Sequence, residues 1–495
     1  MNQNFELLSK ELESLLVHTL GTKHLINPYF RISKGTPEQT RKYLLLNLGT
    51  PRPLILAWNV FLIPINILKF CSSLILSALF FTQNNEFKQG IRNTQVLFLS
   101  HGTKGNLLRT QGDSFFDLLP DNISYQKNVD CTILYTNQNL FGFRKNNILL
   151  AKKNKDLNHI ILPKYLPVLE NFKYAIVISF FAAKTLILGL KCYFDKPDKS
   201  QILLFSLSSY FSRSTYVNYL LLNRIKEFTV KTPITSIFLT FEGHSFEQLV
   251  IDEVSRSNKH INIHLYQHSP IVPLHYGVTS FLNHCKSEVN VLVSGTFYEE
   301  YFRSISNVPK YILFGTSKSV LCGVEENVIN TKKVVYAPEG TNFATQEFIK
   351  LIKDIIKDSM DYTHILRLHP DYKLSFKLRQ KLLSLKKYKN FMISNSNLHR
   401  DLLGANYLVY RSSAVGIESL NYDLIPIFYT DPKLYGLNVL FSNTAAYYTV
   451  KDSTEAIDLL KSTQDKMPDS HKIALANSYF SAIDYTKLNN TIKVI

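Results

Sequence analysis

The C-terminal third of the chain repeats one pattern, in which an apolar run of strand length is followed by a helical segment. The runs are rich in Val, Ile, Leu and Tyr, as in VVYA, THILRL, YLVY and IPIFY. A mostly continuous apolar run is typical of a strand that is buried on both faces, and the intervening helices supply the cover. The pattern therefore predicts an α/β domain built on a parallel sheet.

A second series of the same kind precedes it and includes TQVLFLSH, CTILYTN and VNVLVSG. A polar stretch, CGVEENVINTKK, separates the two series, and 495 residues are too many for one ordinary domain. We expect two Rossmann-like domains that face a cleft, at residues 94–322 and 333–495, after an N-terminal extension at residues 1–93. Ligands of such sheets bind at the carboxyl ends of the strands.

The N-terminal extension contains one long hydrophobic segment, residues 54–81, in which Lys69 is the single charge. The segment is long enough to span a bilayer, but Pro64 and Lys69 divide it into two pieces that are each too short. We expect a shallow helical hairpin or an in-plane helix pair on the inner leaflet, with a buried pair of core helices as the alternative. A second apolar stretch, residues 174–190, is expected to be a core helix because it is short, contains Lys184 and lies within the globular pattern.

Composition limits the partners and the compartment. The formal net charge is +17, from 56 Lys and Arg against 39 Asp and Glu, which favours an anionic membrane surface or phosphorylated substrates as partners. The lysines are scattered and no nucleic-acid-binding motif occurs, so we expect no nucleic-acid partner. Five widely spaced cysteines indicate a reducing compartment and no structural metal. The N-terminus has no signal-peptide pattern, so we expect the protein in the cytoplasm or, given the hydrophobic segment, on the cytoplasmic face of the inner (plasma) membrane.

Polar residues stand at several predicted strand ends of the C-terminal series. In APEGT, a glycine before a helix start can offer backbone N–H groups to a phosphate. In RSSAVGIE, two hydroxyls precede a helix and a carboxylate lies one turn later. Ordinary turns and helix caps are the alternative explanations for these motifs. The candidate ligand-binding residues are Glu339, Gly340, Thr341, Arg367, His369, Ser412, Ser413 and Glu418.

The order VVYAPEG, ILRLHPD and YRSSAVGIESL resembles the C-terminal half of GT-B-fold transferases that use cytidine nucleotides. These families are the polyol-phosphate polymerases of teichoic acid synthesis, the bacterial Kdo transferases and the polysialyltransferase-like enzymes. The resemblance covers roughly residues 333–430 and implies that His369 contacts the donor phosphate or the leaving-group oxygen. It further implies that Ser412 and Ser413 hold phosphate and that Glu418 holds the ribose.

One departure from the teichoic acid pattern narrows the function. Those enzymes usually have TDYSS where this chain has VYRSS, so an aspartate is missing and Arg411 replaces a tyrosine. Sugar transfer is therefore favoured over polyol-phosphate transfer. No GxxxxGK[ST] or GxGxxG fingerprint occurs, which argues against a P-loop ATPase or a dinucleotide-dependent dehydrogenase.

The N-terminal series has two polar strand ends, TFEGHSFEQ and YQHSP, which also resemble elements of surface-carbohydrate biosynthesis proteins. A carboxylate beside a histidine can act as general base on a sugar hydroxyl, and we expect Glu242 to take this role. The alternative is a helix cap, with Ser245 at the N-cap and Glu247 in the first turn. The candidates are Glu242, His244, Glu247, His268 and Ser269.

The sequence thus predicts a metal-independent GT-B glycosyltransferase that needs no cofactor and uses Glu242 and His369 in catalysis. Its expected partners are a nucleotide-sugar donor, most consistent with a cytidine nucleotide, a glycan or lipid-linked acceptor of the cell surface, such as capsule or lipopolysaccharide, and the inner leaflet. A polyol-phosphate transferase and a non-catalytic scaffold of a glycan assembly complex are the alternatives.

Overall fold

The computed structural model describes residues 91–109, 111–137, 153, 157–163, 166–195, 200, 203–204, 207, 210, 213–257, 260–272, 276–285, 287–318, 332–369, 374–430, 438–462 and 467–489. The hydrophobic segment 54–81 lies outside these residues, as do Pro370 and most of the stretch between the two series. The expectations made for them stay predictions.

The first half of the described chain forms a sheet of seven strands in the order β3-β2-β1-β4-β5-β6-β7. All neighbouring strands are parallel. The strands are β1 Val96–Gly102, β2 Cys131–Asn137, β3 Asn158–Ile161, β4 Ser236–Thr240, β5 Asn262–Tyr266, β6 Asn290–Val293 and β7 Lys310–Leu313. The central strands are fully buried, as their continuous apolar runs predicted.

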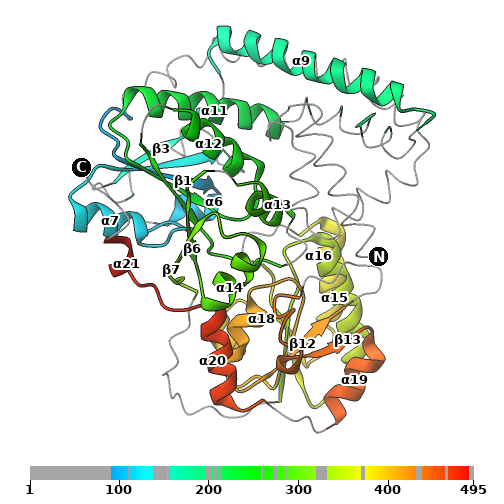
Figure 1. Ribbon diagram of the computed structural model, residues 1–495. Coiled ribbons are helices and arrows are strands. Elements are labelled where there is room, and N and C mark those ends of the chain that lie inside the picture. The colour runs from blue at the N-terminus through cyan, green and yellow to red at the C-terminus, as the bar shows by residue number, and fades with distance from the viewer. Residues whose placement is uncertain are drawn as a thin grey trace.

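Helices follow the strands of the first sheet and cover its two faces (Figure 1). They are α6 Lys104–Leu108, α7 Leu119–Lys127, α9 Val168–Lys191, α11 Arg213–Lys231, α12 Ser245–Arg256, α13 Tyr276–His284 and α14 Thr296–Ile305. The long helix α9 runs along the outer edge of the molecule, beyond α11, rather than between a helix and the sheet (Figure 1).

The expectation that residues 174–190 form a core helix is wrong. This stretch lies within α9, and only 22% of the most apolar part of α9 is buried. Large apolar side chains of α9 face outward, including Ile176 and Phe180, which are 70% and 64% exposed. The prediction failed because hydrophobicity alone does not say which face of a helix meets the protein.

The second half forms a sheet of six parallel strands in the order β10-β9-β8-β11-β12-β13. The strands are β8 Lys333–Ala337, β9 Thr363–Leu366, β10 Phe391–Ile393, β11 Tyr407–Tyr410, β12 Ile425–Tyr429 and β13 Tyr448–Val450. The helices are α15 Asn342–Ile355, α16 Phe376–Leu385, α17 Leu398–Leu402, α18 Val415–Glu418, α19 Ser453–Lys461, α20 Asp469–Tyr479 and α21 Thr486–Asn489, with 3₁₀ turns η2 Ser419–Asn421 and η3 Thr444–Ala446.

After α20 the chain returns to the first sheet. The backbone N–H of Thr316 donates to the carbonyl of Ser481, and that of Ser481 donates to the carbonyl of Ser294. A Cβ on Gly295 would lie 2.2 Å from the carbonyl oxygen of Ser478, so only glycine admits the returning segment. This segment and the rings around Phe297 of α14 join the two halves.

Both sheets are doubly wound, and each has one topological switch point, which is the place between two neighbouring strands where the order of strand addition reverses. In the first sheet β1, β2 and β3 progress one way and β4 then adds to the other side of β1. In the second sheet the same change separates β8 from β11. Ligands of open α/β sheets bind beside the carboxyl ends of the two strands at such a point. The α/β architecture of two Rossmann-like parallel sheets predicted from the sequence is confirmed.

Candidate active site

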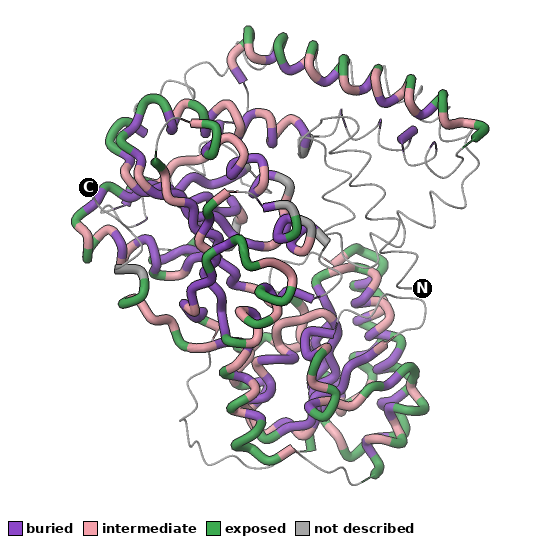
Figure 2. The backbone as a smooth tube through the Cα atoms, viewed as in Figure 1, coloured by how far each residue is buried: buried purple, intermediate pink, exposed green. Residues whose placement is uncertain are grey.

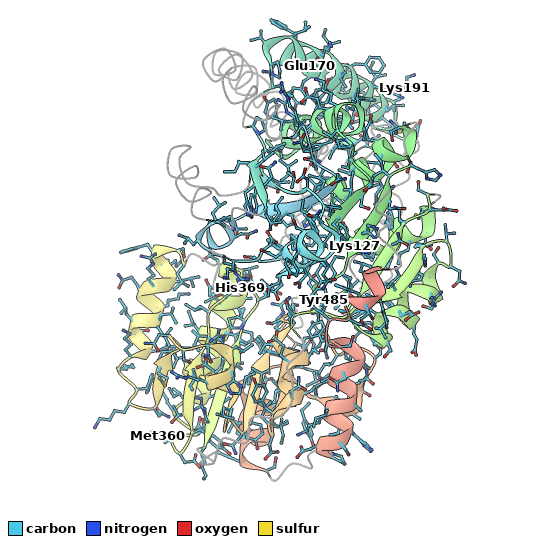
Figure 3. All side chains as sticks on the ribbon, turned by 90° about the vertical axis from the view of Figure 1, so that its left-hand side faces the viewer. Lys127, Glu170, Lys191, Met360, His369 and Tyr485 are labelled. Atoms are coloured by element: carbon cyan, nitrogen blue, oxygen red, sulfur yellow. The ribbon has the colours of Figure 1, made fainter. Side chains whose placement is uncertain are left out.

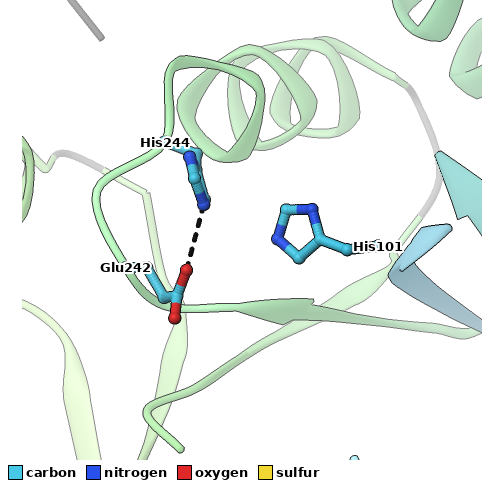
Figure 4. A group of neighbouring side chains, drawn as sticks. All are labelled: His101, Glu242 and His244. Carbon is cyan, nitrogen blue, oxygen red and sulfur yellow. Dashed lines mark hydrogen bonds and ion pairs between the residues drawn. The ribbon is translucent and has the colours of Figure 1, made fainter. Parts of the chain in front are cut away.

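The first candidate group lies at the switch point of the first sheet. His101 is at the carboxyl end of β1, Glu242 follows β4, and His268 follows β5, which are neighbouring strands of the sheet. His244 caps the start of α12, which continues the chain after β4. The side chains of His101, Glu242 and His244 therefore converge, although 141 residues separate the first two in sequence (Figure 4).

Glu242 is the centre of this group. Its Oε2 atom lies 3.0 Å from Nε2 of His244, and its Oε1 atom accepts a hydrogen bond of 2.9 Å from the hydroxyl of Ser269. Nε2 of His268 lies 3.2 Å from the same Oε1 atom. The side chains of the two histidines and of Glu242 are 8–13% exposed, so the contacts form in a largely desolvated setting that strengthens them.

Glu247 has a different place from Glu242. Its carboxylate accepts hydrogen bonds from the backbone N–H groups of Glu242, Gly243 and His244, and from the hydroxyl of Thr240. These contacts satisfy donors at the start of α12 and fix the loop that carries Glu242. The helix-cap interpretation of Glu247 thus describes its contacts, with His244 rather than Ser245 at the N-cap position.

His101 was not singled out by the sequence analysis. It is 5% exposed, and its ring lies 5.0 Å from that of His244 and 4.8 Å from that of Phe115. Phe115 also contacts His268, with ring centroids 5.3 Å apart. Phe115 follows a buried loop in which Asp113 accepts from Ser100 and from backbone N–H groups. The sequence signal that could have identified His101 is a histidine at the end of an apolar strand, the same signal that selected His268 just after β5.

The same side chains could hold a metal ion. One ligand atom each from His101, Glu242 and His244 lie within 4.8 Å of one another. Two imidazoles and a carboxylate are a common zinc ligand set. The contacts of Glu242 with His244 and His268 do not require an ion, because a carboxylate and an imidazole at these distances can hydrogen-bond directly.

The second candidate group lies at the switch point of the second sheet. Glu339, Gly340 and Thr341 follow β8, and His369 follows β9 beside it. His369 is exposed and lies on the side of the second half that faces the first (Figure 3). A Cβ on Gly340 would lie 3.1 Å from the imidazole ring of His369, so the glycine allows the two loops to pack closely.

Glu339 and Thr341 border the start of α15. The Thr341 hydroxyl accepts from the backbone N–H of Ala344 and caps this helix of 14 residues. Glu339 is 6% exposed, and its Oε2 atom accepts no hydrogen bond within the described part of the chain. A buried carboxylate oxygen without a donor is costly, and a ligand that donates a hydrogen bond here would relieve that cost.

Ser412 follows β11 on the other side of the same switch point. Its φ is 49°, in the left-handed region that is strained for a residue with a Cβ. Its hydroxyl is buried and makes no hydrogen bond to any described residue. Ser413 accepts from the backbone N–H of Val415, where α18 begins. Strain and a buried hydroxyl without a partner are features that cluster at ligand-binding sites.

Arg367 and Glu418 lie in charged surroundings. Arg367 donates to Asp401 across 2.6 Å and to the carbonyl of Ser396, so its guanidinium is held by α17 and the loop before it. Burial raises the pKa of Glu418, and the charges of Lys318 and Arg367 oppose this rise. Since Lys318 follows the last strand of the first sheet, Glu418 lies where the two halves meet.

No protein-family model and no curated protein matches the chain. Among solved structures, it is similar to α,α-trehalose 6-phosphate synthase from Burkholderia multivorans, with a TM-score of 0.42, 10% identity, and coverage of 80% of this chain and 93% of that one. It is also similar to the UDP-GlcNAc 2-epimerase of Methanocaldococcus jannaschii in complex with UDP-GlcNAc and UDP, with a TM-score of 0.43, 13% identity, and coverage of 77% and 98%. A third similar structure is Medicago truncatula UGT71G1 complexed with UDP-glucose, with a TM-score of 0.43, 10% identity, and coverage of 78% of this chain and 94% of that one. The assignment of the fold rests on the strand order and register of the two sheets.

Proposed function

We propose that this protein is a glycosyltransferase that moves a sugar from a nucleotide-activated donor to a hydroxyl group of a growing cell-surface glycan. The observation that carries the proposal is which chemical groups lie at the switch point of each sheet. One has a carboxylate held among histidines, and the other has a glycine, a helix N-terminus and polar atoms that no described residue satisfies. The first suits an acceptor hydroxyl and the second suits a nucleotide phosphate.

On the acceptor side, Glu242 is proposed as the general base. An ionised carboxylate only accepts hydrogen bonds, so His244 and His268 each present a protonated Nε2 to it. These contacts and the Ser269 hydroxyl fix the orientation of the carboxylate. As the acceptor oxygen forms its bond to the anomeric carbon, its proton passes to Glu242, and the imidazoles are placed to stabilise the charge that moves.

On the donor side, the bond between the anomeric carbon and the phosphate oxygen breaks, and the nucleotide leaves with the electron pair. His369 and the first N–H groups of α15 are proposed to stabilise the negative charge on the departing phosphate. Ser412 and Ser413 are proposed to contact the phosphate, and Glu339 or Glu418 a hydroxyl of the nucleoside. Gly340 lets the phosphate approach the backbone because it has no side chain.

The motif order VVYAPEG, ILRLHPD and YRSSAVGIESL favours a cytidine nucleotide as the carrier. A net charge of +17 and the hydrophobic segment 54–81 favour a lipid-linked acceptor at the cytoplasmic face of the membrane. The step as drawn needs no metal, because the protein's own donors stabilise the leaving group.

A thermal-shift panel of CMP, CDP, UDP and GDP tests the proposal. A ligand at 100 times its Kd raises the free energy of unfolding by about 2.7 kcal/mol, which is readily measured. We expect at least one nucleotide to stabilise the protein, with a cytidine nucleotide the most effective. Stabilisation by none of the four would contradict the proposal and favour a scaffold role.

A further inference from the structure

The helix α9 is apolar on its outward side as well as on the side that packs against the protein. The buried residues of its protein-facing side are Asn171, Tyr174, Ile178, Ala182, Thr185 and Gly189. Asn171 accepts from the Tyr216 hydroxyl, and Thr185 bonds the Tyr210 hydroxyl across 2.6 Å. In a helix that meets water on its outer side, polar residues would lie outward and apolar ones inward.

The outward side of α9 is exposed along its whole length (Figure 2), and apart from Lys173, Ser179 and Lys191 its exposed residues are apolar. Its exposed members recur every three or four residues, so they form one continuous stripe over 24 helical residues, or about 36 Å. The larger of these side chains are 40–87% exposed. The exposed apolar residues, which we call the α9 stripe, are Val168, Leu169, Phe172, Ile176, Phe180, Ala183, Ile187, Leu190 and, just past the helix, Phe194.

The charges of α9 indicate what covers the stripe. The helix has three lysines, Lys173, Lys184 and Lys191, against one acidic residue, Glu170, which pairs with Lys173 across 2.8 Å. Lys173 and Lys191 are exposed and border the stripe. An anionic lipid surface meets both lysines favourably.

We propose that the α9 stripe is a membrane-docking surface, which inserts in the plane of an anionic bilayer at the level between headgroups and acyl chains. Such helices have bulky apolar residues on one face with lysines beside them. This inference goes beyond the proposed function, because lipid binding by α9 does not depend on the group that the protein transfers.

The packing of α9 favours a helix that lies on the membrane over one that spans it. Its length and composition suffice for a span. However, it is tied along its length to the protein by Asn171, Tyr174 and Thr185, and by the Ser200 hydroxyl, which donates to the carbonyl of Gly189. A span would break these contacts, whereas an in-plane helix keeps them and immerses only the stripe.

Vesicle flotation of the full-length protein tests the proposal. With vesicles of equal parts phosphatidylglycerol and phosphatidylcholine, we expect the doubly substituted Ile176→Glu, Phe180→Glu protein to partition at least about tenfold more weakly than wild type. Met360→Glu is the matched control, because Met360 is 72% exposed and lies at the opposite end of the molecule from α9 (Figure 3). Vesicles of phosphatidylcholine alone should bind wild type more weakly. The difference between the two kinds of vesicle measures the electrostatic contribution to binding, separately from the contribution of the apolar stripe.

A site-specific probe keeps the test decisive if residues 54–81 also bind lipid. The single tryptophan of the chain is Trp58, so Ile176→Trp in a Trp58→Phe background reports on α9 alone. We expect brominated phosphatidylglycerol vesicles to quench this tryptophan and to leave a tryptophan at position 360 unquenched. A tryptophan at position 176 that vesicles do not quench, or that is already shielded without vesicles by another part of the chain or a second copy, would overturn the proposal.

Discussion

The carboxyl edges of the two sheets share a topology but differ in how their polar groups are satisfied. At the edge of the first sheet, Glu242 is held by Ser269, His244 and His268. At the edge of the second, an oxygen of Glu339 and the hydroxyl of Ser412 are buried without a hydrogen bond from described residues. The first edge is preorganised from within the protein, and under the proposed function a ligand completes the second.

Under the proposed function, this difference matches two different tasks. A group that must take a proton needs a fixed orientation before the substrate binds, which hydrogen bonds from the protein provide. A site for a charged ligand must instead keep donors and acceptors available, at some cost in stability. The predictions below test the division, from the largest expected effect to the smallest.

Glu242→Gln should lower kcat by about 10²–10⁴-fold, because the amide keeps the shape of the carboxylate and cannot take a proton. The measurement is release of nucleotide from sugar derivatives of the nucleotide that gives the largest thermal shift. Glu299→Gln is the control, since Glu299 lies on α14 and pairs only with Arg303 in the described contacts. If the activity of Glu242→Gln stayed within a few-fold of wild type, Glu242 would not be the general base.

Glu247→Ala should destabilise the fold by about 3 kcal/mol, or roughly 6–12 °C in melting temperature for a domain of this size. The substitution leaves the Thr240 hydroxyl and the N–H groups of residues 242, 243 and 244 without their acceptor. Thermal melting of the Glu247→Ala and Glu242→Gln proteins separates the two carboxylates. If Glu242→Gln melted as low as Glu247→Ala, both would be structural and the comparison would fail.

His264→Phe should make stability less sensitive to acid. His264 is fully buried on β5 and stacks on Phe238, and burial lowers its pKa from 6.5 to about 3. Because this pKa is lower in the folded state than in the unfolded state, protonation of His264 favours unfolding. The free energy of unfolding is therefore unaffected by His264 above pH 6.5 and falls by about 1.4 kcal/mol per pH unit between pH 6.5 and 3.

The phenylalanine keeps the stacking and cannot bind a proton. The difference in stability between variant and wild type should therefore grow as the pH is lowered below 6.5, measured by denaturant titration at several pH values. A difference that stays constant between pH 7 and pH 4.5 would mean that His264 is not held neutral by burial.

Thr341→Ala should cost about 1 kcal/mol through the lost cap of α15. Thr341→Ser keeps a capping hydroxyl and should restore most of this stability. If the second edge holds phosphate at the start of α15, the alanine variant should also bind nucleotide a few-fold more weakly, because the helix start becomes less ordered. Equal nucleotide affinity in all three proteins would place the phosphate away from α15.

Much of the fold follows from local sequence. IPIFY forms β12 and NIHLY forms β5, because continuous apolar runs are buried on both faces of a parallel sheet. The edge strands β3 and β7 were missed, since NHII and KYIL are short and partly exposed. The return of the chain after α20 was also missed, because it depends on contacts between residues such as Ser294 and Ser481 that are 187 positions apart.

The candidate site could be predicted only in part. Glu242 and Ser269 were selected separately as strand ends, and the structure brings them into contact. His101 was overlooked because the sequence does not reveal that β1 and β4 are neighbours in the sheet. Arg367 was selected for its place beside His369, yet the position of its ion-pair partner Asp401 on α17 is a property of tertiary packing.

Calorimetric titration of the most stabilising nucleotide into wild type, Glu242→Gln and His369→Ala tests the division between the two edges most directly. We predict that Glu242→Gln binds within about twofold of wild type and that His369→Ala binds at least about tenfold more weakly, a loss of roughly 1.4 kcal/mol. His369 is exposed, so its removal should leave the melting temperature of the free protein unchanged. The account is contradicted if Glu242→Gln loses nucleotide binding while His369→Ala retains it.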